Sequence, residues 1–406
     1  MKNEFDGTIK FSTIQKIILL LYFISISAYQ LGTGFDAIFV RLIFIVLMGI
    51  LILFNKKIIF DSQAKWILLF WGFYFLSSIW AKNINEVFYY INNAIQIIGL
   101  SLTLPLTIKE KEDINSMLKL LIFSLVYTGI LLLIRTPLTS LNNTRIGETI
   151  GLHPNTLGMR MAIGVIILLY LMDKMDRKIN KIYYFICMIL FLMLLLLTGS
   201  KKALALVILG FAAFELIKTK GYKKIIKITV LLILFFTLMQ FVMNNSVLYS
   251  ILGRRIERTL LTLQGTAIGL DEDKSLKERV FYIESALKLF KENPIVGYGG
   301  NNFVTYMREI NYSHIAYSHN NFTELLCTLG IIGFCIYYYF WIKIVIILLK
   351  NFYKYKKKND LLFLVIIAIL LILDYGNVSY ISVFNIILLT LANININLER
   401  KKNENN

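Results

Sequence analysis

The chain has 406 residues, of which 57% are hydrophobic and 17% are charged, and its formal net charge is +18. This amount of apolar sequence excludes a disordered chain, which lacks enough apolar surface to bury. The apolar residues form continuous runs, whereas the strands of a membrane β-barrel alternate in segments of roughly ten residues. The basic residues form short clusters between the runs, without a stacking platform, so nucleic-acid binding is not expected.

In chain order, twelve apolar runs predict membrane-spanning helices of the roughly 20 residues that a bilayer requires. The runs cover residues 14–29, 37–54, 66–80, 87–106, 117–134, 157–172, 182–197, 203–217, 225–243, 322–349, 361–373 and 378–394. The sequence therefore predicts an all-α, polytopic membrane protein with about twelve spans. The polar stretch 1–15 precedes a span without a small-residue cleavage site and is predicted to be retained.

Lysine and arginine in the short loops set the predicted orientation, because cytoplasmic loops are enriched in these residues. With a cytoplasmic N-terminus every cytoplasmic loop is basic, and the even span count places both termini on that side of the cell membrane. The segment 244–318 is then extracytoplasmic. This divides the chain into a bundle at 1–243, a catalytic loop at 244–318, and a second bundle with a cytoplasmic tail at 319–406.

The outer loop is predicted to contain an amphipathic helix at 276–291. Val280, Ile283, Leu287 and Phe290 recur there at helical spacing, with lysine and glutamate on the opposite side. Such a helix lies on the membrane surface or on the bundle of spans. It is expected to end at Asn293 and Pro294.

Several cations fall on the predicted outer side, against the general rule. Arg145 and Arg160 flank the outer start of the sixth run, Lys201 lies in the turn 198–202, and Arg279 lies in the outer loop. Insertion energetics disfavour such positions, so a function that retains these residues is expected. The alternative is that their side chains extend to lipid phosphates.

His319, which is one of three histidines, lies where the outer loop enters the tenth run. If a helix starts there, Gly330 lies three turns below His319 on the same face, because eleven residues make almost three full turns. Together with Gly333, it is expected to let another helix approach closely. Glu324, about one turn below, is expected either to orient the imidazole or to hydrogen-bond a neighbour.

The segment His319-Asn320, nine residues, Gly330, two residues and Gly333 resembles the signature of the bacterial O-antigen ligase and polymerase family, H-[NSQ]-x9-G-x-x-[GTY]. Upstream, the family's R…A…P-x-x-G-x-G-x-x-x-F pattern is similar to Arg279, Ala286, Pro294, Gly297, Gly299 and Phe303. Residues 198–201 resemble the family's T-G-S-R turn, and 153–158 resemble its N-P-N-x-x-G segment. Lys201 departs from the family's arginine, and lysine makes no bidentate phosphate contact.

The resemblance implies extracytoplasmic glycosyl transfer from a polyisoprenyl-diphosphate-linked glycan to an acceptor hydroxyl, without metal or other cofactor. His319 and Arg279 are then the predicted catalytic residues. Arg145, Arg160, Lys201, Asn320 and Glu324 are predicted to bind the diphosphate or the glycan. His319 can either deprotonate the hydroxyl or hydrogen-bond the leaving diphosphate, and the sequence does not choose between these roles.

Two enzymatic hypotheses share this donor and site: a polysaccharide polymerase, which we favour, and a ligase that transfers a finished glycan to a lipid, wall polymer or protein. A transporter of lipid-linked glycans is a less favoured alternative, because it predicts inverted repeats that the sequence does not show. A sensor or scaffold is less favoured still. The expected partners are the bilayer, the lipid-linked substrate, and the flippase and chain-length regulator of the same pathway.

Overall fold

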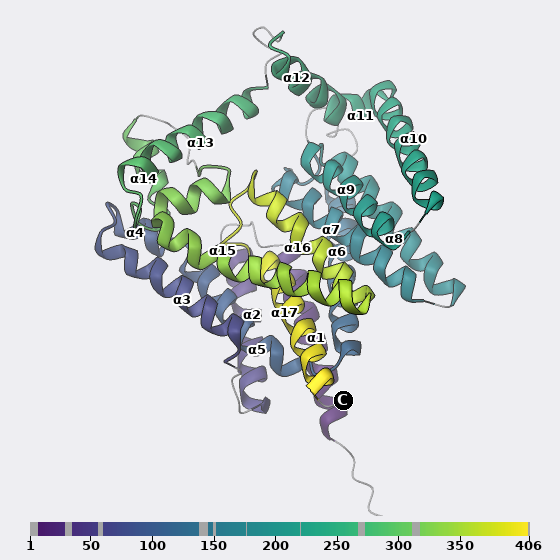
Figure 1. The fold of residues 1–406 in the computed structure, drawn as a ribbon, viewed down its shortest axis with the longest axis horizontal. Coiled ribbons are helices and arrows are strands. Elements are labelled where there is room, and N and C mark those ends of the chain that lie inside the picture. The colour runs from purple at the N-terminus through teal and green to yellow at the C-terminus, as the bar shows by residue number, and fades with distance from the viewer. Residues whose placement is uncertain are drawn as a thin grey trace, which may run out of the picture. The chain divides into compact units, whose positions relative to one another are not determined.

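The fold is described from a computed structural model, and every regular element within the described residues is a helix (Figure 1). The structure describes residues 7–28, 35–55, 60–137, 145–148, 152–175, 177–219, 221–266, 273–310 and 317–404. The chain divides into two compact units. Unit 1 comprises Met1–Leu53 and Glu110–Asp273, and unit 2 comprises Phe54–Lys109 and Lys274–Asn406.

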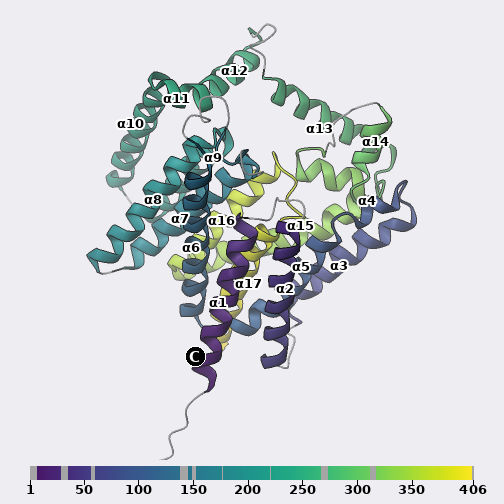
Figure 2. The same ribbon diagram turned by 180° about the vertical axis from the view of Figure 1, so that it is seen from behind.

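Unit 1 is organised around one buried helix, α7 (Pro154–Lys174), which packs against three others. In its most apolar stretch 78% of the residues are buried, compared with 6% in α10. Proline at the first turn suits a helix start, because the missing N–H would have no partner there. Figure 2 shows α1 alongside α6. The other helices are α1 (Gly7–Ala28), α2 (Phe35–Asn55), α6 (Lys111–Arg135), α8 (Lys178–Leu197), α9 (Lys201–Lys218), α10 (Tyr222–Asn244), α11 (Ser246–Leu248), the π-helix η4 (Tyr249–Gly253) and α12 (Arg254–Leu263).

Unit 2 is organised around α15 (Asn321–Tyr355), which packs against α3, α13 and α16. Aromatic side chains fill the space between α3 and α15: Trp66 stacks on Phe340 with ring centroids 4.7 Å apart, and its indole N–H donates to the Ile336 carbonyl. The other helices are α3 (Ser62–Leu76), the 3-10 helix η1 (Ser77–Ile79), α4 (Ile84–Phe88), α5 (Ile91–Thr107), α13 (Lys274–Glu292), α14 (Phe303–Glu309), α16 (Lys358–Asp374) and α17 (Val383–Glu404).

Each of the twelve predicted apolar runs overlaps a helix, which is consistent with the predicted helical membrane-protein class. Within the described residues, six helices are long and apolar enough to cross a membrane: Ile84–Thr107, Lys111–Arg135, Pro154–Lys174, Lys178–Leu197, Tyr222–Asn244 and Asn321–Tyr355. Two shorter apolar helices cover Thr13–Ala28 and Ile38–Ile52. The count of twelve spans, the outer loop and the division at 243 and 318 stay predictions.

The predicted amphipathic helix is present as α13, but a different face of it is buried. Tyr282 and Ala286 are its buried residues, whereas Val280 is 47% exposed and Leu287 is 37% exposed. The short side chain of Ala286 permits close packing on α15, and Tyr282 supplies a large contact area beside it. Periodicity alone located the helix, but it did not identify the face that contacts the protein.

Candidate active site

The centre of the site is a break in α15 at Gly330, whose backbone angles are φ 63° and ψ −168°. The break removes the helical hydrogen bonds that would join the 331 and 332 N–H groups to the 327 and 328 carbonyls. The turn 294–299 replaces both. Ile331 and Ile332 donate to the carbonyls of Pro294 and Ile295, at 2.9 and 3.3 Å.

The same turn also satisfies the carbonyls on the other side of the break. Tyr298 N–H donates to the Cys327 carbonyl at 3.0 Å, and Gly299 N–H donates to the Thr328 carbonyl at 2.7 Å. Four backbone groups that a break inside an apolar helix would leave unpaired therefore have partners. The Pro-x-x-Gly-x-Gly motif is held against the helix that follows the histidine.

Glycine is required on both sides of this contact. A Cβ atom on Gly330 would collide with the Ile295 carbonyl and lie 2.6 Å from the Val296 nitrogen. A Cβ atom on Gly297, where φ is 67°, would lie 2.5 Å from the Thr328 carbonyl carbon. The expectation that Gly330 lets another helix approach was wrong: the segment that approaches is the turn. At Gly333 an added Cβ would meet the Leu329 side chain of the same helix.

His319 was expected on the first turn of a continuous helix, and this expectation was also wrong. Its φ angle is 55°, and α15 begins only at Asn321, with Asn320 as the N-cap. The Asn320 side chain accepts hydrogen bonds from the N–H groups of Phe322 and Thr323, at 2.9 and 3.2 Å. An asparagine in this position satisfies N–H groups that no helical carbonyl can reach. His319 therefore sits on a left-handed bend before the helix, so its direction is not set by helix periodicity.

Glu324 helps to fix this bend. Its carboxylate is 1% exposed and accepts the Ser318 N–H at 2.8 Å, while the Ser318 hydroxyl donates to the Asn320 carbonyl at 2.8 Å. Of its two expected roles, a hydrogen bond to a neighbouring residue is the one seen. Glu324 thus holds the backbone on the N-terminal side of His319.

Aromatic rings flank the imidazole of His319. Tyr282 of α13 stacks on it with ring centroids 5.6 Å apart and planes 25° apart, and Tyr317 lies 4.1 Å away at 40°. Burial raises the pKa of Tyr317 above its usual value, and the charge of Arg279 opposes that shift. Arg279 lies one turn before Tyr282, and its Nε is buried without a hydrogen-bond partner in the described residues. The start of α13 thus brings a cation beside the ring that contacts the histidine.

The remaining motif residues pack beneath this group. Phe303, Ala286, Tyr282 and Cys327 belong to one buried cluster with Met307, and each is at most 4% exposed. The cluster joins α13, α14 and α15. The spacing of the motif thus has a packing reason: Ala286 and Phe303 support the helix that positions Arg279 and Tyr282.

A second support comes from the segment 77–86, whose role the sequence did not reveal. The Glu86 carboxylate accepts from Asn301 Nδ2 at 2.9 Å and forms an ion pair with Arg308 at 2.6 Å. Gly300 N–H donates to the Ser77 hydroxyl at 2.8 Å. The loop after α3 and the loop before α15 therefore lie on the same side of unit 2, as the predicted topology requires.

Three motifs of unit 1 also meet. Arg145 Nε donates to the Thr198 carbonyl at 2.5 Å, and its Nη2 donates to Asn155 Oδ1 at 2.8 Å. A Cβ atom on Gly158 would lie 2.8 Å from the Thr198 hydroxyl and 3.1 Å from the Ser200 Cβ. The predicted turn 198–201 and the predicted segment 153–158 thus pack directly on each other, and Arg145 joins them.

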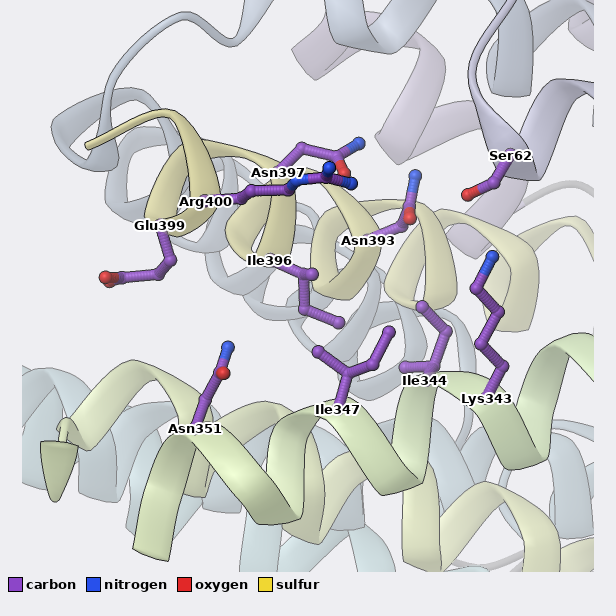
Figure 3. A pocket seen from close by; sticks show the side chains of 10 residues that line it. All are labelled: Ser62, Lys343, Ile344, Ile347, Asn351, Asn393, Ile396, Asn397, Glu399 and Arg400. Atoms are coloured by element: carbon purple, nitrogen blue, oxygen red, sulfur yellow. The ribbon is translucent and has the colours of Figure 1, made fainter. Parts of the chain in front are cut away.

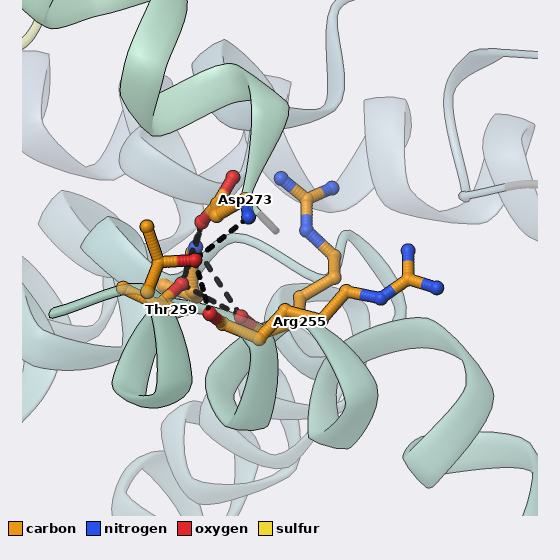
Figure 4. A network of polar contacts seen from close by, with 6 residues as sticks. Arg255, Thr259 and Asp273 are labelled. Carbon is orange, nitrogen blue, oxygen red and sulfur yellow. Dashed lines mark hydrogen bonds and ion pairs between the residues drawn. The ribbon is translucent and has the colours of Figure 1, made fainter. Parts of the chain in front are cut away.

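Lys201 enters a separate polar network with the end of unit 1 (Figure 4). Its ammonium group forms an ion pair with Asp273 at 2.6 Å and contacts the Thr259 hydroxyl, which itself donates to Asp273 at 2.6 Å. It also donates to the Arg255 carbonyl at 3.3 Å. An anion that binds Lys201 must therefore compete with Asp273.

Arg160 lies 5% exposed within unit 1, so extension to lipid phosphates does not describe it. Its Nη1 donates to the carbonyls of Ile26 and Ser27, at 2.9 and 3.1 Å. These carbonyls belong to the last turn of α1, where a cation is favoured by the partial negative charge of the helix end. The roles in substrate binding expected for Arg145, Arg160 and Lys201 stay predictions.

The helical fold and the six long apolar helices of the described residues are consistent with a multi-pass helical membrane protein. Residues 186–338 match the family model described as O-antigen ligase. The predicted resemblance to the O-antigen ligase and polymerase family is thereby confirmed over this segment. The match contains the turn 198–201, Arg279, the Pro-x-x-Gly-x-Gly motif and His319; it begins after Arg145 and Arg160. No curated protein matches the chain.

Proposed function

We propose that the protein is a polysaccharide polymerase, which transfers glycan repeat units from a polyisoprenyl-diphosphate donor to an acceptor sugar hydroxyl outside the cytoplasm. The observation that carries the proposal is the arrangement around His319. His319 contacts two tyrosine rings on the bend before α15, and Arg279 of the same motif lies one turn before Tyr282, one of those two residues. The basic loops on the opposite side of the predicted topology support an extracytoplasmic site in the cell membrane.

The reaction forms one bond and breaks another. The acceptor oxygen attacks the anomeric carbon of the donor, and the bond from that carbon to the diphosphate oxygen breaks, so that its electron pair leaves with the diphosphate. The hydroxyl proton passes to His319 in the general-base version. In the alternative version His319 donates a hydrogen bond to the departing diphosphate, and water takes the proton.

Arg279 supplies the charge that this step requires beside His319. The leaving diphosphate gains negative charge, and a guanidinium group can hold two phosphate oxygens at once. Its Nε is buried and aimed at no acceptor within the described residues, so a substrate oxygen can complete its hydrogen bonding. Tyr317, which is partly exposed, presents a ring on which a sugar can stack.

A second function, ligation of a finished glycan to another acceptor, is favoured by one observation: the matching family model is described as an O-antigen ligase. Polymerase and ligase share the donor and the bond that breaks. They differ in the acceptor, so the acceptor must be varied in the test.

The test is turnover of the purified full-length protein with a polyisoprenyl-diphosphate-linked repeat unit in EDTA. A polymerase gives a product ladder, and His319→Ala and Arg279→Ala abolish it. Lys288→Ala is the matched control, because Lys288 is an exposed cation on the same helix, and it should behave as wild type. Transfer only after addition of a separate lipid or protein acceptor would identify a ligase. Activity that persists in folded His319→Ala, or that requires a divalent cation, would contradict the proposal.

Under this proposal, the expected partners are the flippase that delivers the lipid-linked repeat unit and a regulator of chain length. A polymerase needs the first because its substrate is assembled on the other side of the membrane. The test uses vesicles that contain this protein alone, with the donor supplied on one face only. Transfer under these conditions would separate the reaction itself from the contributions of the flippase and the regulator.

A further inference from the structure

Two neighbouring cavities lie in unit 2, on a part of α15 far along the helix from His319. The first has a volume of about 380 Å³ and lies between α15, α17 and the start of α3. The second has a volume of about 500 Å³ and lies between α3 and α15. Ser62, at the first residue of α3, lines both.

The two cavities follow one stripe of α15. Cys335 and Tyr339 line the second, and Lys343, Ile347 and Asn351 continue into the first. Neighbours in this series are four residues apart, so each lies one turn beyond the last and about 40° further round the helix, which amounts to about 160° from Cys335 to Asn351. Because Ser62 lines both cavities, they adjoin as successive parts of one groove that winds along the helix toward its C-terminal end.

The chemistry of the groove changes along its length. Trp66, Leu69 and Tyr339 make the second cavity mainly apolar, and Lys65 is the one charged residue in its lining. Lys343 and Arg400 bring two cations into the first, and Figure 3 shows Lys343 and Asn351 directed from α15 toward Asn393 and Arg400 on α17.

One carboxylate also lines the first cavity, that of Glu399, but it forms an ion pair with Lys357 and is 2% exposed. Within the described residues Lys343 forms no ion pair; its ammonium group lies 6.0 Å from the Phe340 ring. The Asp61 carboxylate, which accepts hydrogen bonds from Asn393 and Asn397 of the lining, is the second anion at this end. The cations Lys343, Lys357 and Arg400 thus outnumber the carboxylates of Asp61 and Glu399 by one.

We propose that this groove binds an anionic phospholipid, with the phosphate between Lys343 and Arg400 and an acyl chain along Trp66, Leu69 and Cys335. Basic pockets between membrane helices are suited to acidic lipid headgroups. From Lys343 to Cys335 the helix rises about 12 Å, which is within the half-thickness of the hydrocarbon core of roughly 15 Å. The headgroup thus lies toward the end of α15 and the chain toward the middle of the bilayer.

This site is separate from the glycosyl-transfer site, because it occupies the opposite end of α15. The lipid bound here lies in the other leaflet, which is the cytoplasmic leaflet in the predicted topology. It contacts α15, the helix that begins beside His319. Free phosphate shares the headgroup chemistry but has no chain for the apolar half of the groove.

Cys335 reports on the groove directly. It is exposed, whereas Cys187 and Cys327 are buried, so alkylation of the folded full-length protein by N-ethylmaleimide modifies Cys335 selectively. In detergent micelles, phosphatidylglycerol at ten times its Kd should slow this reaction by about tenfold. Phosphatidylcholine with the same chains should slow it much less, and inorganic phosphate should neither protect Cys335 nor displace the lipid.

Lys343→Ala and Arg400→Ala should each weaken the protection by phosphatidylglycerol by about fivefold, the effect of one cation near an anionic lipid. Lys343→Arg should retain it, which separates loss of charge from misfolding. Lys350→Ala, an exposed cation of α15 outside the groove, is the matched control. Equal protection by both lipids, displacement by inorganic phosphate, or wild-type protection in folded Lys343→Ala would each overturn the proposal.

Discussion

Substitution of Gly330 by alanine tests the contact on which the candidate site is built. The backbone there, at φ 63° and ψ −168°, lies in a region that is essentially restricted to glycine. The added Cβ atom would also collide with the carbonyl of Ile295. The turn must then move away from α15, because a backbone atom cannot rotate aside as a side chain can.

The cost can be worked from the contacts that change. Holding alanine in this backbone region costs about 1–3 kcal/mol. The hydrogen bonds from Ile331 and Ile332 to the turn contribute roughly 1 kcal/mol each. The substitution is therefore expected to favour release of the turn by about 3–5 kcal/mol. At about 3 kcal/mol the released fraction rises roughly a hundredfold.

Alkylation of Cys327 measures that release. Cys327 is 0% exposed, and its carbonyl accepts the hydrogen bond from Tyr298 in the turn. In a Cys335→Ser background, Gly330→Ala should speed modification of Cys327 by about a hundredfold if the turn opens and closes faster than the reagent reacts. Glycosyl transfer should fall as well, because the bend that presents His319 is one short helical segment away.

Gly72→Ala is the matched control, since a Cβ atom on this helical glycine of α3 has no heavy atom within 4 Å. It should leave Cys327 protected and stabilise the helix by up to about 1 kcal/mol. A folded Gly330→Ala variant with wild-type protection of Cys327 and wild-type transfer would refute the reasoning.

Three further substitutions test individual contacts, each by the apparent melting temperature in detergent together with transfer activity. Asn320→Ala removes the N-cap of α15 and should cost about 1 kcal/mol, whereas Asn320→Ser should retain most of it; equal losses would show that capping is not its role. The buried Asp374 carboxylate accepts hydrogen bonds from the Tyr338 hydroxyl, the Asn321 amide and the Ser379 hydroxyl. Asp374→Ala leaves these donors without that acceptor and should cost about 2–3 kcal/mol, more than Tyr338→Phe, which removes one donor; the reverse order would contradict this network. Arg145→Lys keeps the charge, but a lysine cannot bond both the Thr198 carbonyl and Asn155 in the same geometry, so the substitution should cost about 1–2 kcal/mol. Its cost should not add to that of Asn155→Ala, because both substitutions remove the same contact; strict additivity would exclude the contact.

The helices were predictable from sequence because each follows from local pattern. The apolar runs are long, and the start of α13 and its end before Pro294 follow from periodicity and from the inability of proline to continue a helix. Residues of one motif were likewise predicted together. Ala286 and Phe303 do pack in one buried cluster of unit 2, on the helix that also carries Arg279. Tyr282 was missed, although its position three residues after Arg279 places it on the same helix face.

The class of protein, the positions of the helices and the family signature could be predicted from the sequence, because they depend on composition and on short, fixed spacings. The role of each spacing in the fold was set by tertiary contacts. Gly330 breaks a helix that periodicity would continue, because the turn at Pro294 supplies the hydrogen bonds that the break removes. His319 lies on a left-handed bend, and Glu324 fixes that bend by accepting a backbone N–H. These backbone conformations depend on hydrogen bonds between segments that are far apart in the chain. A local sequence pattern contains no information on which distant segment supplies the donor or the acceptor.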